Sequence, residues 1–160
     1  MRGGALPPAL LCAALGFALA FVRGRRLGLS IGLLIFGAVL VEAIRFPLAW
    51  REAAFIGLWL STIAAAASVH LPGGPPPKIS LAFSLNAGIW SGAVISVSGQ
   101  PLDLLKALPA VLFVLPAAWL VARQRGVFVK VAASWLIEIS CLCAVLPLIP
   151  TPGYMPDHMD

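Results

Sequence analysis

Charged residues are scarce in this chain. Lys and Arg number 11 and Asp and Glu number 6 among 160 residues, which is 11% of the total. Soluble domains carry about 25% charged residues, so this sequence cannot cover a folded surface with charge. Hydrophobic residues make up 61%, and the mean hydropathy is +1.00. The chain therefore has no room for a separate water-soluble catalytic or nucleic-acid-binding domain, and we expect no nucleic-acid partner.

Cysteines and catalytic motifs are also few. The three cysteines, Cys12, Cys141 and Cys143, lie inside apolar segments, which argues against a disulfide framework, and a Cys-x-Cys pair lacks zinc-site spacing. The sequence has no glycine-rich phosphate loop, no His-Glu-x-x-His helix, no Gly-x-Ser-x-Gly elbow and no Ser-His-Asp set. The sequence leaves the cofactor unknown and disfavours an enzyme.

Long apolar runs, in contrast, fill the chain. A spanning helix needs about 20 apolar residues to cross a hydrocarbon core of about 30 Å. Six runs approach that length, and they cover residues 5–22, 27–44, 53–71, 79–99, 102–122 and 127–149. We predict one all-α, polytopic transmembrane bundle over residues 1–160 with six spanning helices. Five spans are the alternative if the fifth run, which Pro109 and Pro116 interrupt, is re-entrant.

A proline- and glycine-rich linker at residues 72–78 divides the chain into two groups of three runs. Proline lacks an amide donor and fixes φ, so no helix continues through this segment. An odd number of spans in each group would make the two halves run in opposite directions, as in a 3+3 inverted repeat. The alternative is two unrelated groups, because the halves show no clear residue-by-residue similarity.

Basic residues divide unequally between the two sides of such a bundle. Alternate loops carry seven Lys and Arg on one side and four on the other, and cytoplasmic loops are the richer in basic residues. The seven are Arg23, Arg25, Arg26, Lys78, Arg123, Arg125 and Lys130, and the four are Arg2, Arg45, Arg51 and Lys106. We predict a multi-pass cell (inner) membrane protein with both termini on the non-cytoplasmic side.

Small residues at four-residue spacing mark the fourth run. They let helix backbones approach closely inside a membrane, so we predict that this stripe is a helix-packing seam, with a lining for a transport pathway as the alternative. The stripe consists of Ser84, Gly88, Gly92 and Ser96.

Ionisable residues inside apolar runs are costly and often functional. Glu42 with Arg45, and Asp103 with Lys106, have the spacing of ion pairs at helix ends. Glu138 differs, because it lies eight residues, or about 12 Å, past Lys130 in an apolar run. Asn86 lies at a similar depth if its run enters from the same side. Ser134 and Cys141 share the Glu138 face, and we predict a polar intramembrane site that consists of Glu138, Asn86, Ser134 and Cys141.

Two functions fit these features, and we predict the first of them, with the second as its alternative. The first is movement or conduction of a small solute or ion through the bundle, with the Glu138 site on its route. The second is a non-catalytic accessory or assembly subunit of a larger membrane complex, with Glu138 at an interface or as a hydrogen-bonding group. In both cases we expect the lipid bilayer as surroundings and either a homo-oligomer or other membrane subunits as partners.

Overall fold

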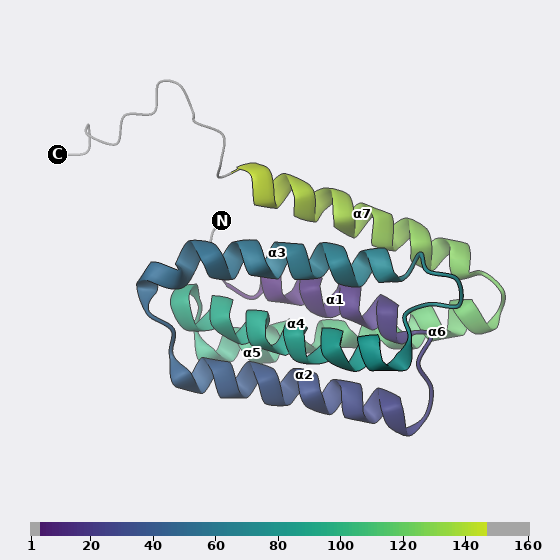
Figure 1. Ribbon diagram of the computed structural model, residues 1–160, viewed down its shortest axis with the longest axis horizontal. Helices are drawn as coiled ribbons and strands as arrows, with labels where there is room; N and C mark the ends of the chain where they lie inside the picture. Colours follow the sequence, from purple (N-terminus) through teal and green to yellow (C-terminus); the bar gives the residue numbers. More distant parts are fainter. Residues whose placement is uncertain (1–3, 147–160) are drawn as a thin grey trace.

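The computed structural model describes residues 4–146, and in this range the chain forms helices joined by turns, with no strand. The predicted all-α bundle is confirmed, with six helices packed side by side (Figure 1). Arg2 and residues 147–149 of the sixth predicted run lie outside the described residues. The helices are α1 (Leu6–Leu19), α2 (Arg25–Ile44), α3 (Arg51–Ser68, after the 3-10 turn Leu48–Trp50), α4 (Pro77–Ser98), α5–η2–α6 (Pro101–Ala107, Leu108–Phe113, Val114–Ala122) and α7 (Gly126–Val145).

Prolines and glycines set several helix ends. Pro77 and Pro101 are the first residues of α4 and α5, where a missing amide donor costs no helical hydrogen bond. Gly24 precedes α2 with a φ of 65°, a left-handed conformation that glycine adopts without strain. The Pro- and Gly-rich linker was predicted over residues 72–78, and α4 begins within its last two residues, at Pro77.

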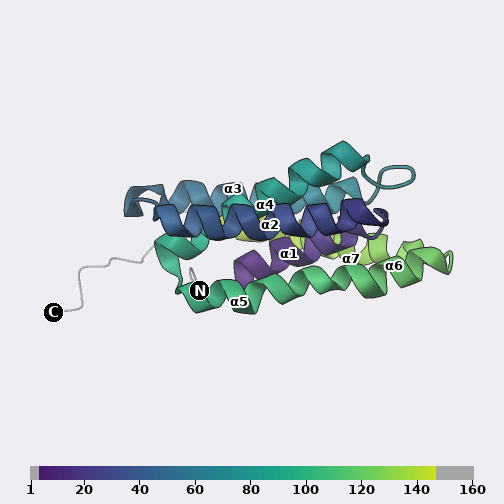
Figure 2. The same cartoon turned by 90° about the horizontal axis from the view of Figure 1, so that it is seen from below.

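The fifth helix changes its hydrogen-bonding pattern in its middle. The 3-10 stretch η2 begins at Leu108, beside Pro109, because proline cannot donate the bond that would continue the α-helix. Figure 2 shows α5 and α6 in line along one edge of the molecule. The fifth run therefore extends along the whole bundle, and it does not fold back as a re-entrant segment would.

Helix α1 occupies the centre of the bundle. It packs against α3, α4 and the α5–η2–α6 helix, and Leu11, Cys12, Leu15 and Leu19 are fully buried. Its 14 residues span only about 21 Å, less than the hydrocarbon core. Protein rather than lipid therefore encloses most of α1, whose first residue, Leu6, is exposed.

The helix pairs show partial symmetry between the two halves. Four helix pairs join the halves: α2 packs along α4, α5–η2–α6 along α1, α1 along α4 and α3 along α7. Exchanging the first three helices with the last three maps these pairs onto one another. The α1–α3 and α3–α4 contacts break the pattern, because α4 makes no comparable contact with α7 and α1 contacts α7 only slightly.

Four helices are long and apolar enough to cross a membrane, namely α2, α4, α5–η2–α6 and α7. Helix α1 is shorter, and α3 begins with Arg51 and Glu52, which lower its hydropathy. Large apolar side chains are exposed on the outside of the long helices, for example Phe36, Leu115 and Trp135. Surfaces of this kind suit lipid and not water. The chain is a membrane protein with several helices.

One end of the bundle, called here the basic end, consists of the turns 20–24, 69–76 and 123–125 and the helix ends beside them. All seven basic residues that the sequence assigns to one side lie at or near this end. The acidic residues Glu42, Glu52 and Asp103 lie near the opposite end. The predicted excess of basic residues on one side thus corresponds to one end of the bundle.

Candidate functional site

Helix α7 carries three of the four predicted site residues on its outside. It packs against α3, and its buried side chains are Val129, Ala133, Leu136 and Ser140. Ser134, Glu138 and Cys141 are all exposed. Glu138 lies two positions from both Leu136 and Ser140, which is about 200° around a helix of 3.6 residues per turn. Its side chain therefore points almost directly away from α3.

Ser134 has one polar contact, and it is with the end of α3. Its Oγ lies 3.3 Å from Nε2 of His70, a residue just past the last turn of α3 at the basic end. Glu138 has no hydrogen bond or ion pair with any residue in the range 4–146, where the one ion pair joins Lys106 to Asp103. Ser134 and Glu138 thus share a face of α7 but have different surroundings.

Asn86, the fourth predicted site residue, belongs to a separate polar network between α3 and α4. Its Nδ2 donates a hydrogen bond to Ser61 Oγ at 2.7 Å, and its Oδ1 accepts one from Trp90 Nε1 at 3.1 Å. Asn86 is half-buried and Ser61 is buried. Both lie near the middle of their helices, where lipid offers no hydrogen-bond partner, so this network satisfies polar groups inside the bundle.

The structure does not bring Glu138 and Asn86 together. Helix α3 packs against both α4 and α7 and lies between them, and α4 and α7 make no substantial contact (Figure 1). A polar site that joins the two residues required contact between the fourth and sixth helices, and α3 occupies that position. Sequence reasoning did not single out Ser61, although a Ser-Thr pair in the middle of an apolar run is a visible signal.

The small-residue stripe of α4 faces α2. A Cβ atom at Gly88 or Gly92 would collide with the α2 backbone carbonyls of Leu34 and Ala38, respectively. Ser84 and Ser96 hydrogen-bond to backbone carbonyls of α4 itself, those of Ser80 and Ala93. The two helices therefore approach closely only because these positions lack side-chain bulk.

The two expected helix-end ion pairs differ in outcome. Lys106 Nζ lies 3.1 Å from Asp103 Oδ1, and Asp103 also accepts a hydrogen bond from the amide of Gln100 at 3.0 Å. The Glu42–Arg45 pair is wrong, because no such contact forms. Arg45 leaves the helix with a φ of 53° and a ψ of 93°, so its side chain no longer follows the helical spacing.

Residues 4–146 contain no group of three or more His, Cys, Asp and Glu side chains that could hold a metal ion. Comparisons with known proteins give no relative: no protein-family model, no curated protein and no solved structure matches the chain. The polar side chains themselves are thus the basis for a functional proposal.

Proposed function

We propose that the protein is a non-catalytic subunit of a larger membrane assembly and that it binds its partner through the outer face of α7. This face, named here the α7 outer face, consists of Val131, Trp135, Glu138 and Leu142. The observation that carries the proposal is the position of Glu138, which is exposed in the middle of an apolar helix and points away from the rest of the bundle.

The surroundings of Glu138 make its exposure costly. It lies 12 residues from the start of α7 and 7 from its end, or about 18 Å and about 10 Å along the axis. Trp135 and Leu142 beside it are 68% and 58% exposed, so an isolated chain would present Glu138 to lipid. A charged side chain near the bilayer centre costs at least about 3 kcal/mol. A partner that supplies a cation or hydrogen bonds removes that cost.

Helix α7 is also the least enclosed of the long helices. Only 22% of its most apolar stretch is buried, against 50% for α4. Figure 1 shows α7 on the outside of α3, on the far side of the molecule from α2. An α-helix attached along one side leaves the rest of its surface for lipid or for another membrane helix.

The chemistry of Glu138 supports one class of partner. Its counterpart would be a transmembrane helix with a Lys, Arg or His, or an amide side chain, at the same depth. A symmetric dimer through the α7 outer face does not supply one, because parallel α7 helices would place Glu138 opposite Glu138. The basic residues in the described range lie near the helix ends, with Lys130 eight residues away. We therefore favour a different membrane subunit over a homodimer.

Transport through this bundle receives less support from the geometry. The two residues that suggested it, Glu138 and Asn86, lie on different helices with α3 between them. A route past Glu138 would have to run along the outside of α7, between this chain and another. The accessory function explains the same exposed carboxylate with one docking contact.

We further propose that the protein lies in the cell (inner) membrane, with the basic end in the cytoplasm and both termini outside. Six helices and a one-sided distribution of basic residues support this orientation.

Recovery of the partner from the native membrane tests the proposal. The tagged full chain would be purified in mild detergent, with Glu138→Ala as the test variant and Glu52→Gln as the control. The control also removes one carboxylate, at an exposed position of α3. We expect a second membrane protein to co-purify at a fixed molar ratio with the wild-type chain and with the Glu52→Gln variant. This partner should carry a basic or amide side chain inside an apolar span. Its recovery should fall several-fold with Glu138→Ala. Recovery of the wild-type chain alone, or equal recovery with both variants, would contradict the proposal.

A further inference from the structure

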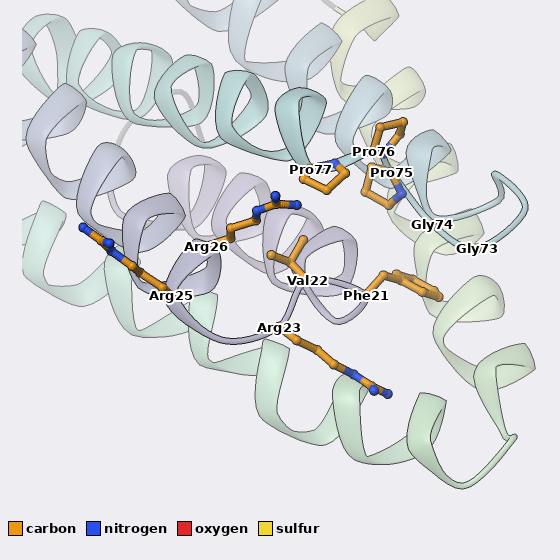
Figure 3. Close-up of a pocket in the computed structure, with 10 residues that line it drawn as sticks. All are labelled: Phe21, Val22, Arg23, Arg25, Arg26, Gly73, Gly74, Pro75, Pro76 and Pro77. Carbon is orange, nitrogen blue, oxygen red and sulfur yellow. The ribbon is translucent and has the colours of Figure 1, made fainter.

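A pocket at the basic end is lined mainly by arginines, prolines and glycines. Its volume is about 610 Å³, within the range of small-molecule sites. The turn between α1 and α2 forms one side, and the Pro- and Gly-rich turn before α4 forms the other. Figure 3 shows Arg26 reaching toward Pro77, while Arg23 and Arg25 extend to opposite sides.

The pocket walls are held in a defined shape. Gly74 has a φ of 81°, and a Cβ atom there would collide with the ring of Phe21. This contact joins the two turns. The three consecutive prolines that follow Gly74 have restricted backbones, so little conformational freedom is left for a ligand to remove.

Basic residues without acidic neighbours surround the pocket. Arg23, Arg25 and Arg26 are exposed, Lys78 follows the pocket-lining Pro77, and no Asp or Glu of the described chain lies at this end. Helices α2 and α4 both begin here and lie side by side. Neither helix has a side-chain cap or an acidic residue in its first turn, so their positive dipole ends add to the arginines.

We propose that this pocket binds the phosphate group of an anionic phospholipid. Arginine binds phosphate oxygens through two parallel hydrogen bonds, and basic pockets between transmembrane helices bind anionic headgroups. The pocket lies at the start of two membrane-length helices, where headgroups lie.

Binding measurements on the purified full chain in detergent test the proposal. The probes are dihexanoyl-phosphatidylglycerol, dihexanoyl-phosphatidylcholine and inorganic phosphate, with native mass spectrometry to count bound molecules and titration to give Kd. The test variant is Arg25→Gln/Arg26→Gln. The control is Arg123→Gln/Arg125→Gln, which removes the same charge from the same end of the bundle but leaves the pocket intact. Unfolding without lipid checks that each variant is folded.

We expect phosphatidylglycerol to bind wild type about tenfold more tightly than phosphatidylcholine. The test variant should weaken phosphatidylglycerol binding about tenfold, since each basic residue near an anionic lipid contributes a several-fold factor. The control should change it less than about twofold. If the test variant does not fold, Arg23→Gln, in the turn, should show a smaller loss in the same direction.

Three results would overturn the proposal. Equal losses in the two double variants would mean a diffuse attraction of lipid to the basic end. Inorganic phosphate that binds as tightly as phosphatidylglycerol would assign the pocket to a free anion. Wild-type protein that does not distinguish the two lipids would leave no anionic lipid site here. None of these results bears on the partner proposed for α7.

Discussion

Gly57 on α3 lies beneath the indole ring of Trp90 on α4. A Cβ atom at position 57 would stand 2.5 Å from Cη2 and Cζ3 of that ring, closer than van der Waals contact allows. The same tryptophan donates its Nε1–H to Asn86. The absence of a side chain at Gly57 therefore leaves room for the Trp90 ring in the position from which it completes the polar network between the two helices.

Gly57→Ala is expected to lower the stability of the bundle by about 1–3 kcal/mol, because the added methyl group displaces the Trp90 ring. Gly28→Ala is the matched control, since it adds the same methyl group to a helix position with nothing within 4 Å. Alanine favours a helix over glycine, so the control should be neutral or stabilising. Thermal unfolding in detergent measures both, and equal unfolding temperatures would contradict the assigned contact.

A bulky residue at the α2–α4 contact should lower the stability of the bundle more than Gly57→Ala does. Gly92→Leu should force the two helices apart, since even a Cβ atom collides with the carbonyl of Ala38. Gly32→Leu, on the exposed side of α2, should leave the protein monodisperse and stable. Size-exclusion profiles and unfolding temperatures compare the two variants. If Gly92→Leu matches Gly32→Leu, then α4 does not pack on α2 through this stripe.

Two buried serines allow the stability contribution of a hydrogen bond to be compared with that of burial alone. Ser61 accepts a bond from Asn86, whereas the buried Ser140 hydroxyl has no partner among the described residues. Ser61→Ala should therefore cost about 1 kcal/mol, and Ser140→Ala should cost nothing or stabilise the protein. In a double-mutant cycle with Asn86→Ala, Ser61→Ala should be non-additive and Ser140→Ala additive. The reverse pattern would refute the Asn86–Ser61 bond.

The proposed orientation predicts which turns a membrane-impermeant thiol reagent reaches. In a chain without Cys12, Cys141 and Cys143, single cysteines would replace Pro76 at the basic end and Ala49 in the exposed turn at the opposite end. Intact cells should label Ala49→Cys only, and inverted membrane vesicles should label Pro76→Cys only. Labelling of Pro76→Cys in intact cells would reverse the orientation.

Hydropathy predicted most of the fold because a bilayer requires long apolar runs that end at breakers. The second run, 27–44, and the fourth, 79–99, match α2 and α4 to within two residues at each end. The first run was predicted too long, and the third was displaced, because α3 begins two residues before the predicted start and ends three residues before the predicted end. Residues 20–22 are apolar, as are Val69 and Leu71 on either side of His70, but both segments leave the helix, and hydropathy does not distinguish a packed apolar turn from a helix.

The site was harder to predict, because the sequence of α7 does not show which side faces the bundle. The helix is apolar around most of its circumference, so the common face of Ser134, Glu138 and Cys141 could be inside or outside. The contact with α3 through Ala133 and Leu136 decides this, and such a contact depends on the whole fold. The arginines were visible in the sequence as orientation signals, but the pocket needs the two turns together.

Site-specific photocrosslinking in the native membrane tests the α7 docking surface most directly. A photoreactive residue at Trp135, 68% exposed on the α7 outer face, is compared with one at Phe36, 60% exposed on α2. We expect the photoreactive residue at position 135 to give one adduct of defined mass, and the one at position 36 to give none. The adduct at position 135 should disappear when Glu138 is also replaced by Ala. An adduct of twice the chain's mass would show self-association instead. Adducts with lipid alone at both positions would contradict the claim that a partner subunit covers α7.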